Sequence, residues 1–165
     1  MGGTSIAFVE EMAKTRAEFI AFGKAVFGDP ANAARIVAEI NASAGVRSVQ
    51  IDAECRAILH YAAVCFNLSG GLFDITAGVL RRIWSIERTQ RPAQAELAPI
   101  LDLIDFNQVE ITDDTVFLPR AGMEIDLGGV VKEYAADALA QKVQSFEIDS
   151  AVINLGGDIF CVGAR

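Results

Sequence analysis

The amino-acid sequence predicts an α+β fold, a mixed sheet with packed helices, because helix-like and strand-like segments alternate irregularly along it. Of its 165 residues, 52% are apolar and 22% are charged, which is the composition of a folded chain with a sizeable core. Chains of this length usually form one domain, so we expect a single domain over residues 1–165.

Four elements are expected in the first third of the chain. The stretch "GTSIAFV" (3–9) is typical of a short strand, and apolar residues between Glu10 and Phe27 recur at helical spacing. The "GDP" stretch ends that helix, and Pro30 suits the first turn of a second helix, which stops at Gly45. Residues 46–51 then alternate as a short strand.

The remaining elements follow with short connections. Residues 53–71 predict a strongly apolar helix, "LFDITAGVLRRIW" predicts a short helix in its second half, and 91–104 predicts another helix. The alternation over 108–119 predicts a hairpin that turns at Asp113 and Asp114. A strand at 124–127 leads into a helix that ends near Val143, and residues 150–164 predict two apolar strands around a Gly-Gly-Asp turn.

Charge and cysteine content exclude several classes of function. The 14 basic and 22 acidic residues give a net charge of −8, which argues against a nucleic-acid or anionic-membrane surface. The three cysteines lack the spacing of a disulfide framework or a zinc site, so we expect Cys65 and Cys161 to be small core residues. We expect no transmembrane segment and no signal peptide, and therefore a cytoplasmic location unless a leader has been removed.

The stretch "EIDLGGVVKEYAADALAQKV" (124–143) joins a strand to a helix through a glycine pair. Helix N-termini bind anions through unsatisfied amides and the helix dipole, so a phosphate on this helix is one interpretation. Lys132 would add a positive charge, and Asp126 would hold a sugar hydroxyl or an amine. The alternative is a packing joint in which Gly128 and Gly129 let two segments approach closely.

Two further stretches carry similar alternatives. In "SGGLFDIT" (69–76), Phe73 would stack on a flat ring and Asp74 would accept from a ring or ribose donor. The alternative is a helix cap formed by Asp74 or Thr76. The stretch "NLGGDI" (154–159) predicts a tight hairpin turn. We expect His60 to be a core residue that is either hydrogen-bonded or half-exposed.

In combination, "SGGLFDITAGVL", "DLGGVVKEYAADALA" and "AVINLGGDIFCVG" resemble the motifs of the FAD:protein FMN transferase family, also called ApbE. The family patterns read approximately S-G-G-A-F-D-x-T-x-G-P-L, D-L-G-G-I-A-K-G-Y-A-x-D and N-x-G-G-D-I. "MGGTSIAFV" resembles the early M-G-T-x-Y strand of the family, and "EINASAG" resembles its I-N-x-x-A-G.

This resemblance implies an α+β, T-fold-like domain that binds FAD and a divalent metal, usually Mg²⁺. The implied reaction transfers FMN from FAD to a Thr or Ser hydroxyl of a target flavoprotein and releases AMP. The implied partners are therefore FAD and that flavoprotein, with a homo- or hetero-oligomer as an open alternative. The residues implied to contact FAD are Met1, Leu72, Phe73, Asp74, Asp126 and Lys132, and Gly129 would offer its backbone carbonyl to the metal.

The sequence departs from the family pattern at two places that matter for chemistry. Glu133 replaces a glycine in the family's K-G-Y, and the later motif H-I-x-D-P-x-T-G, with its metal-binding Asp and Thr or Ser, has no counterpart. We therefore expect a domain that is incomplete at its C-terminus. Two functions stay open: the Mg²⁺-dependent transferase, and a non-catalytic FAD-binding or flavoprotein-assembly relative without the metal-binding half.

Overall fold

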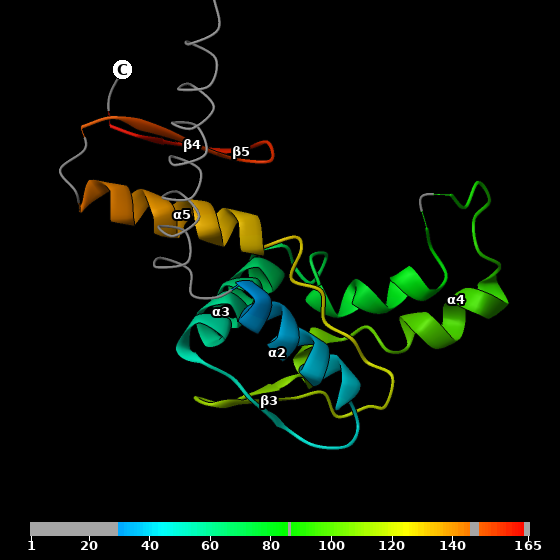
Figure 1. Ribbon diagram of the computed structural model, residues 1–165. Coiled ribbons are helices and arrows are strands. Elements are labelled where there is room, and N and C mark those ends of the chain that lie inside the picture. The colour runs from blue at the N-terminus through cyan, green and yellow to red at the C-terminus, as the bar shows by residue number, and fades with distance from the viewer. Residues whose placement is uncertain (1–29, 86, 146–148, 164–165) are drawn as a thin grey trace, which may run out of the picture. The chain divides into compact units, whose positions relative to one another are not determined.

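A computed structural model of the chain describes residues 30–85, 87–145 and 149–163 (Figure 1). The chain divides into two compact units. The larger unit is Ala33–Tyr134, and the described residues of the smaller unit are 30–32, 135–145 and 149–163. Met1 and the strand and helix expected before Pro30 lie outside the described residues, and the expectation of a single domain stays a prediction.

The larger unit combines helices with a small sheet, in agreement with the predicted α+β class. The sheet was predicted to be mixed, whereas all strand pairs of the described residues are antiparallel. The sheet order is β1-β3-β2, and Val116 of the central strand lies opposite Val49 on one side and Ile111 on the other. Its helices and strands are most of α2 (Pro30–Ala42), β1 (Val49–Gln50), α3 (Ala53–Leu68), η1 (Ile75–Arg82), α4 (Gln94–Leu101), η2 (Phe106–Gln108), β2 (Glu110–Ile111), β3 (Thr115–Phe117) and the start of α5 (Val131–Gln144).

The core of this unit lies where α2 and α3 pack against one face of the sheet (Figure 1). Leu59 and Val116 are completely buried, and Ile40 is almost so. Burying apolar side chains of this size contributes about 1.5–3 kcal/mol each. The alternation expected for residues 108–119 is confirmed, since Val116 points into the core while its neighbours Thr115 and Phe117 are only half-buried.

The helix boundaries follow local signals. Pro30 begins α2, as expected, and α3 begins after Asp52, whose carboxylate accepts from the Cys55 amide at 2.8 Å. The helix expected over 91–104 is shorter, because the Glu96 carboxylate accepts from the Ala93 amide at 2.8 Å and so starts α4 at Gln94.

The expected strand at 124–127 is wrong in one respect, because it joins no sheet among the described residues. Its alternation is present: Ile125 and Leu127 are buried, while Glu124 and Asp126 are half-exposed. The backbone partners are not strand residues. Ile125 bonds with the side chain of Asn41, and the Asp126 amide donates to the Ile75 carbonyl at 2.8 Å.

The smaller unit packs the later part of α5 against a two-stranded hairpin, β4 (Ala151–Leu155) and β5 (Asp158–Val162). Leu139 and Ala140 of the helix contact Ile153 and Val162 of the hairpin. The predicted glycine turn is confirmed: Gly156 and Gly157 have φ of 67° and 109°, values that suit a two-residue turn and favour glycine. The Asn154 side chain accepts from the Gly157 amide at 2.9 Å.

The expectation for the cysteines is partly wrong. Cys161 is exposed, because it alternates with Val162 along β5 and therefore points away from α5. Cys65 is half-buried, and the buried cysteine is Cys55 at the start of α3. His60 on α3 is exposed rather than part of the core.

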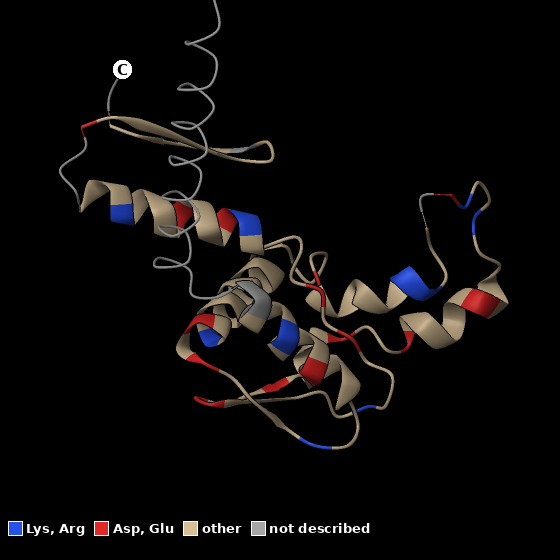
Figure 2. Cartoon of the chain, viewed as in Figure 1, with Lys and Arg blue, Asp and Glu red and all other residues tan. Residues whose placement is uncertain are grey.

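Lys and Arg positions are scattered over several elements of the described chain, as expected from the sequence (Figure 2). Among the described residues, no helix combines the length and the apolar character that crossing a membrane requires.

Candidate functional site

The stretches "SGGLFDIT" and "EIDLGG" meet within the larger unit. Besides the bond between the Asp126 amide and the Ile75 carbonyl, Gly78 of η1 lies directly against Asp126. A β-carbon on Gly78 would stand 3.1 Å from the Asp126 β-carbon and 3.2 Å from its amide nitrogen, which is closer than side chains normally approach. Gly78 therefore lets η1 lie this close to the second stretch without displacing Asp126.

Phe73 and Gly129 are the second point of contact between the two stretches. A β-carbon on Gly129 would stand 3.0 Å from Cε2 and 3.3 Å from Cζ of the Phe73 ring. The ring therefore lies against the backbone at Gly129. The structure thus brings together Phe73, Asp126 and Gly129, three positions for which the sequence predicts contact with FAD or a metal.

Asp74 acts as a helix cap, which confirms one of the two interpretations of its stretch. Its Oδ1 accepts from the Thr76 amide at 2.7 Å and from the Thr76 hydroxyl at 2.6 Å, and its Oδ2 accepts from the Phe106 amide at 3.0 Å. These three bonds begin η1 and connect it to η2. A direct contact between Asp74 and FAD stays a prediction.

The Ser-Gly-Gly turn determines which way the next two side chains point. The Ser69 hydroxyl donates to the Phe66 carbonyl and accepts from the Phe73 amide, both at 2.9 Å. Gly70 and Gly71 have φ of 64° and 85°, which only glycine adopts without strain. The turn leaves Leu72 93% exposed and Phe73 half-buried.

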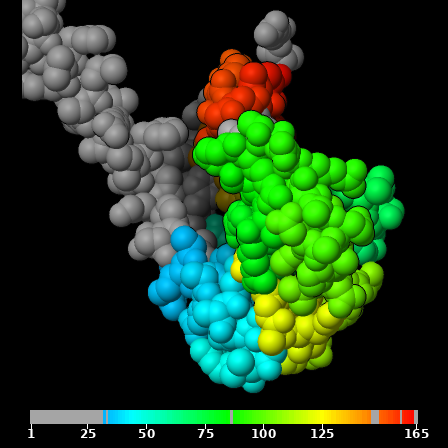
Figure 3. Space-filling view, turned by 90° about the vertical axis from the view of Figure 1, so that its right-hand side faces the viewer, coloured from blue at the N-terminus to red at the C-terminus, as the bar shows by residue number. Residues whose placement is uncertain are grey.

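Asn41 is a positioning residue to which sequence reasoning assigned no role. Its Nδ2 donates to the Ile125 carbonyl at 3.0 Å, and its Oδ1 accepts from the Ile125 amide at 2.8 Å. The side chain therefore binds the segment before the glycine pair as a neighbouring strand would. The corresponding segments, coloured cyan and yellow, lie side by side in Figure 3. The signal was present in "EINASAG", where Asn41 occupies the asparagine of the family's I-N.

Two arginines at the end of η1 face the two carboxylates of "EID". Arg82 donates through Nε to Oε1 of Glu124 at 3.0 Å, and its Nη2 also pairs with Glu124 and donates to the Gly122 carbonyl at 2.8 Å. Arg81 Nη1 lies 2.6 Å from Oδ2 of Asp126, and its Nη2 lies 3.7 Å from Oε2 of Glu124. Sequence reasoning missed this cluster, although adjacent arginines at a helix end are a usable signal.

The turn before α5 uses several of its own amides. The Gly128 amide donates to Oδ1 of Asp126 at 2.8 Å, and the amides of Val130 and Val131 donate to the Leu127 carbonyl at 3.0 Å. These three amides have intramolecular acceptors, which supports the packing interpretation of the glycine pair. A phosphate at this corner would depend more on side-chain charge than the sequence suggested.

Two groups at the starts of α3 and α5 have shifted pKa values. Burial raises the pKa of the Tyr134 phenol, and the nearby charge of Glu54 adds to the effect. Burial also raises the pKa of the Glu54 carboxyl, with a further contribution from Asp52. Tyr134 is therefore a neutral hydroxyl at physiological pH.

The described residues do not by themselves form a magnesium site. Mg²⁺ needs near-octahedral oxygen coordination, usually with one or two carboxylates. In the described ranges, no three His, Cys, Asp or Glu side chains come close enough to hold a metal ion. One carboxylate oxygen of the described residues, Oε2 of Glu133, is buried without a hydrogen-bond partner. Even together with the carbonyl predicted at Gly129, one such oxygen would be an incomplete donor set for Mg²⁺.

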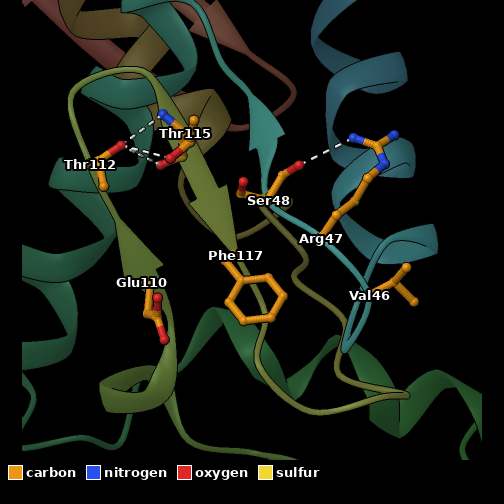
Figure 4. Close-up of a pocket in the computed structure, with 7 residues that line it drawn as sticks. All are labelled: Val46, Arg47, Ser48, Glu110, Thr112, Thr115 and Phe117. Carbon is orange, nitrogen blue, oxygen red and sulfur yellow. Dashed lines mark hydrogen bonds between the residues drawn. The ribbon is translucent and has the colours of Figure 1, made fainter.

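A separate groove of about 340 Å³ lies over the outer face of the small sheet (Figure 4). Its polar groups bond with one another or with close neighbours. Arg47 pairs with Glu39 at 2.9 Å and donates to the Ser48 carbonyl, and the hydroxyls of Thr112 and Thr115 lie 2.7 Å apart. None of the three glycine-containing stretches supplies a residue that lines this groove, so we place the candidate site where "SGGLFDIT" and "EIDLGG" meet.

The predicted site residues thus divide into three groups. Phe73, Asp126 and Gly129 lie together, with Asp74 capping the helix beside them. Leu72 and Lys132 are exposed. Met1 lies outside the described residues, so nothing tests its predicted contact with FAD.

Comparison with known proteins gives concordant results. The sequence profile of the ApbE family matches residues 29–165. The chain is 34% identical over 138 residues to a FAD:protein FMN transferase of Treponema pallidum, covering 78% of this chain and 38% of the relative. It is 29% identical over 131 residues to a FAD:protein FMN transferase of Klebsiella pneumoniae, covering 77% of this chain and 42% of that relative.

The fold is also shared with a solved structure. The crystal structure of the ApbE protein from Thermotoga maritima superposes with a TM-score of 0.70 at 28% sequence identity, covering 79% of this chain and 44% of the other. The chain therefore spans less than half the length of each of these three proteins.

Proposed function

The chain belongs to the ApbE family, and from that premise we propose that it acts in flavin transfer as a FAD:protein FMN transferase. In the proposed reaction, a Thr or Ser hydroxyl of a target flavoprotein attacks the FMN phosphorus of FAD. A phosphoester forms, the pyrophosphate bond breaks, AMP leaves and the hydroxyl proton passes to solvent. The observation that carries the proposal is the meeting of "SGGLFDIT" and "EIDLGG" around Phe73, Asp126 and Gly129.

Each residue of this corner has a proposed part in binding FAD. The half-buried Phe73 ring offers an apolar face to a flat ring, and the stacking of a nucleic-acid base on an aromatic side chain is worth about 1–3 kcal/mol. Asp126 accepts a hydrogen bond from a sugar hydroxyl or an amine of FAD. Leu72 and Lys132 are exposed, and we assign Leu72 the part of covering the ligand and Lys132 that of offsetting the pyrophosphate charge.

We propose that FMN transfer requires Mg²⁺. When bound, it would supply electrostatic stabilisation of the phosphoryl group. The described residues offer too few ligands to hold it by themselves, so we assign no reaction step to the metal and name no catalytic base.

The shortage of metal ligands among the described residues favours a second function. A chain whose described residues hold no group of three metal-ligating side chains also suits a non-catalytic FAD-binding or flavoprotein-assembly protein. This protein would bind FAD at the same corner and would not cleave it.

One experiment separates these functions. The purified chain is incubated with FAD, Mg²⁺ and a flavoprotein domain that carries an acceptor threonine, and the acceptor is analysed by intact mass while AMP is measured by chromatography. An FMN adduct with an equal amount of AMP supports the transferase. FAD binding without adduct or AMP supports the second function, and absence of both binding and transfer rejects the two together. A parallel reaction with Phe73→Ala tests whether the signal depends on this corner.

A further inference from the structure

The four charged residues between η1 and the "EID" stretch are not equivalent. Arg82 has its guanidinium engaged by Glu124 and by the Gly122 carbonyl, and its side chain is 37% exposed. Arg81 makes one hydrogen bond, to Asp126, and a longer ion pair with Glu124, and its side chain is 60% exposed. Arg82 therefore connects the two segments, whereas Arg81 is more exposed to solvent and pairs with Asp126.

The Asp126 carboxylate is held from two directions. Oδ2 accepts from Arg81 Nη1 at 2.6 Å, and Oδ1 accepts from the Gly128 amide at 2.8 Å. Each carboxylate oxygen can accept a second hydrogen bond, so the group still has acceptor capacity for a ligand. Arg81 and Gly128 thus determine the direction in which that remaining capacity points.

Arg81 contributes little to stability, because exposed ion pairs are worth about 0–1 kcal/mol. Its larger effect is on the local charge. Glu124 and Asp126 carry two negative charges at the corner proposed to bind FAD, whose pyrophosphate is also negatively charged, and Arg81 with Arg82 offsets the two carboxylates. Without Arg81, only the Gly128 amide would hold the Asp126 carboxylate, and the uncompensated negative charge would repel the substrate.

We propose that Arg81 is a positioning residue for FAD, which orients and neutralises the Asp126 carboxylate and through it the Gly128 turn. This inference rests on the function proposed above. It assigns Arg81 no contact with FAD: the residue acts through Asp126.

The test is a double-mutant cycle on FAD affinity, measured by fluorescence titration of the full chain at low ionic strength. Arg81→Ala is expected to weaken FAD binding about tenfold, and Arg81→Lys, which keeps the charge but loses the planar donor pair, about threefold. In an Asp126→Asn background, Arg81→Ala should weaken FAD binding by less than about twofold, because the carboxylate on which Arg81 acts is already absent. The melting temperature of Arg81→Ala should stay within about 2 °C of wild type.

Arg47→Ala is the matched control. Arg47 is 57% exposed and pairs with Glu39, so this variant removes an arginine of similar exposure from another place in the same unit. FAD affinity should not change. An equal loss in Arg47→Ala and Arg81→Ala would mean that the effect is one of net charge, and the inference would be overturned.

A measurement made in the absence of FAD tests the role of Arg81 independently of the proposed function. Loosening Asp126 should speed hydrogen exchange of the Gly128 amide in Arg81→Ala by at least about threefold, as followed by NMR. If wild type fails to bind FAD, the proposed function falls, and Gly128 exchange still decides whether Arg81 positions the turn. If wild type binds FAD and Arg81→Ala binds it equally well, the inference alone falls. Equal losses in the wild-type and Asp126→Asn backgrounds would show that Arg81 acts by itself, which also overturns it.

Discussion

Asn41 and Gly78 hold neighbouring residues of the same short segment. Asn41 satisfies both backbone groups of Ile125 with one side chain, and Gly78 lets η1 approach Asp126 closely enough for the adjacent backbone bond to Ile75 to form. Ile125 itself is completely buried. At this scale the site depends on residues that fix the backbone before any ligand arrives.

Replacing Asn41 should destabilise the protein markedly. Asn41→Leu leaves the Ile125 amide and carbonyl without their partners in a largely dry environment, so we expect a loss of about 3 kcal/mol in the free energy of unfolding. Urea titration followed by circular dichroism measures it. Asn67→Ala, which alters an exposed asparagine near the end of α3, is the control and should change stability by less than about 0.5 kcal/mol. A similar small change for Asn41→Leu would contradict the positioning role.

The two site glycines should respond differently to alanine. At Gly78 the added methyl meets the backbone of Asp126 and Ile125 at 3.2 and 3.3 Å, so we expect a loss of about 1–3 kcal/mol in stability. At Gly129 it meets the edge of the Phe73 ring, which is able to rotate away. Gly129→Ala should therefore unfold near the wild-type midpoint and bind FAD more weakly. The reverse pattern in urea melts and FAD titrations would show that the ring position is unimportant.

The cysteines should differ strongly in reactivity. Burial raises the pKa of the Cys55 thiol to about 11, and the charges of Asp52 and Glu54 add to the effect. A position at the N-terminus of a helix would by itself lower the thiol pKa, but burial and the two negative charges have the larger effect. At pH 8 a disulfide reagent should label exposed Cys161 at least about a hundred times faster than Cys55. Cys161→Ser should remove the fast phase, and Cys55→Ala should leave it intact.

The same pKa shift predicts a pH dependence of stability. The folded state favours the protonated thiol, so the contribution of Cys55 is complete below the pKa of the unfolded thiol. It falls as the pH rises from that value, about 8.5, toward 11.

At the scale of elements, the two 3-10 helices offer a comparison between two aspartate caps. Asp105 caps η2 and bonds only with residues two and three positions ahead, Asn107 and Gln108. Asp74 caps η1 and also accepts from the Phe106 amide, 32 residues away. The first cap is local, whereas the second joins two elements that are distant in the chain.

Asp74→Ala should therefore cost more than Asp105→Ala. We expect about 2–3 kcal/mol for Asp74→Ala, because three donors in a partly buried position lose their acceptor. Asp105→Ala, at a site open to water, should cost about 1 kcal/mol or less. Thermal and urea unfolding of both variants, recorded together, compare them. Equal costs would mean that the link to η2 is unimportant for stability.

At the scale of the whole molecule, the candidate site belongs to the unit Ala33–Tyr134, and the chain spans less than half of each compared relative. The binding contacts proposed for Phe73 and Asp126 do not require a metal. FAD binding and FMN transfer are therefore expected to respond differently to metal removal.

We expect EDTA to change the FAD dissociation constant by less than about threefold while it abolishes any FMN transfer. The first measurement is a fluorescence titration, and the second is the intact mass of the acceptor. Restoring Mg²⁺ in excess is the control for transfer. A large loss of FAD affinity in EDTA would show that a metal takes part in binding, in disagreement with the incomplete donor set of the described residues.

The sequence by itself determined the α+β class, the types of most elements, the hairpin turns and the family. It did so because helical and strand periodicity, glycine turns and motif spacing are local properties, which a chain shows before it folds. It also marked Phe73, Asp126 and Gly129 as positions of interest. It could not say whether Asp74 caps a helix or faces a ligand, because both uses need the same residue type.

Only the tertiary structure decided how the site is held together. Asn41 meets Ile125 across 84 residues, Arg81 meets Asp126 across 45, and Asp74 meets Phe106 across 32. Contacts of this kind depend on which segments the core brings together, and no local pattern encodes that. For the same reason the segment 124–127 resembles a strand in sequence but is bound by an asparagine side chain and a helix carbonyl: its alternation shows which side is buried, whereas its hydrogen-bond partners depend on the fold.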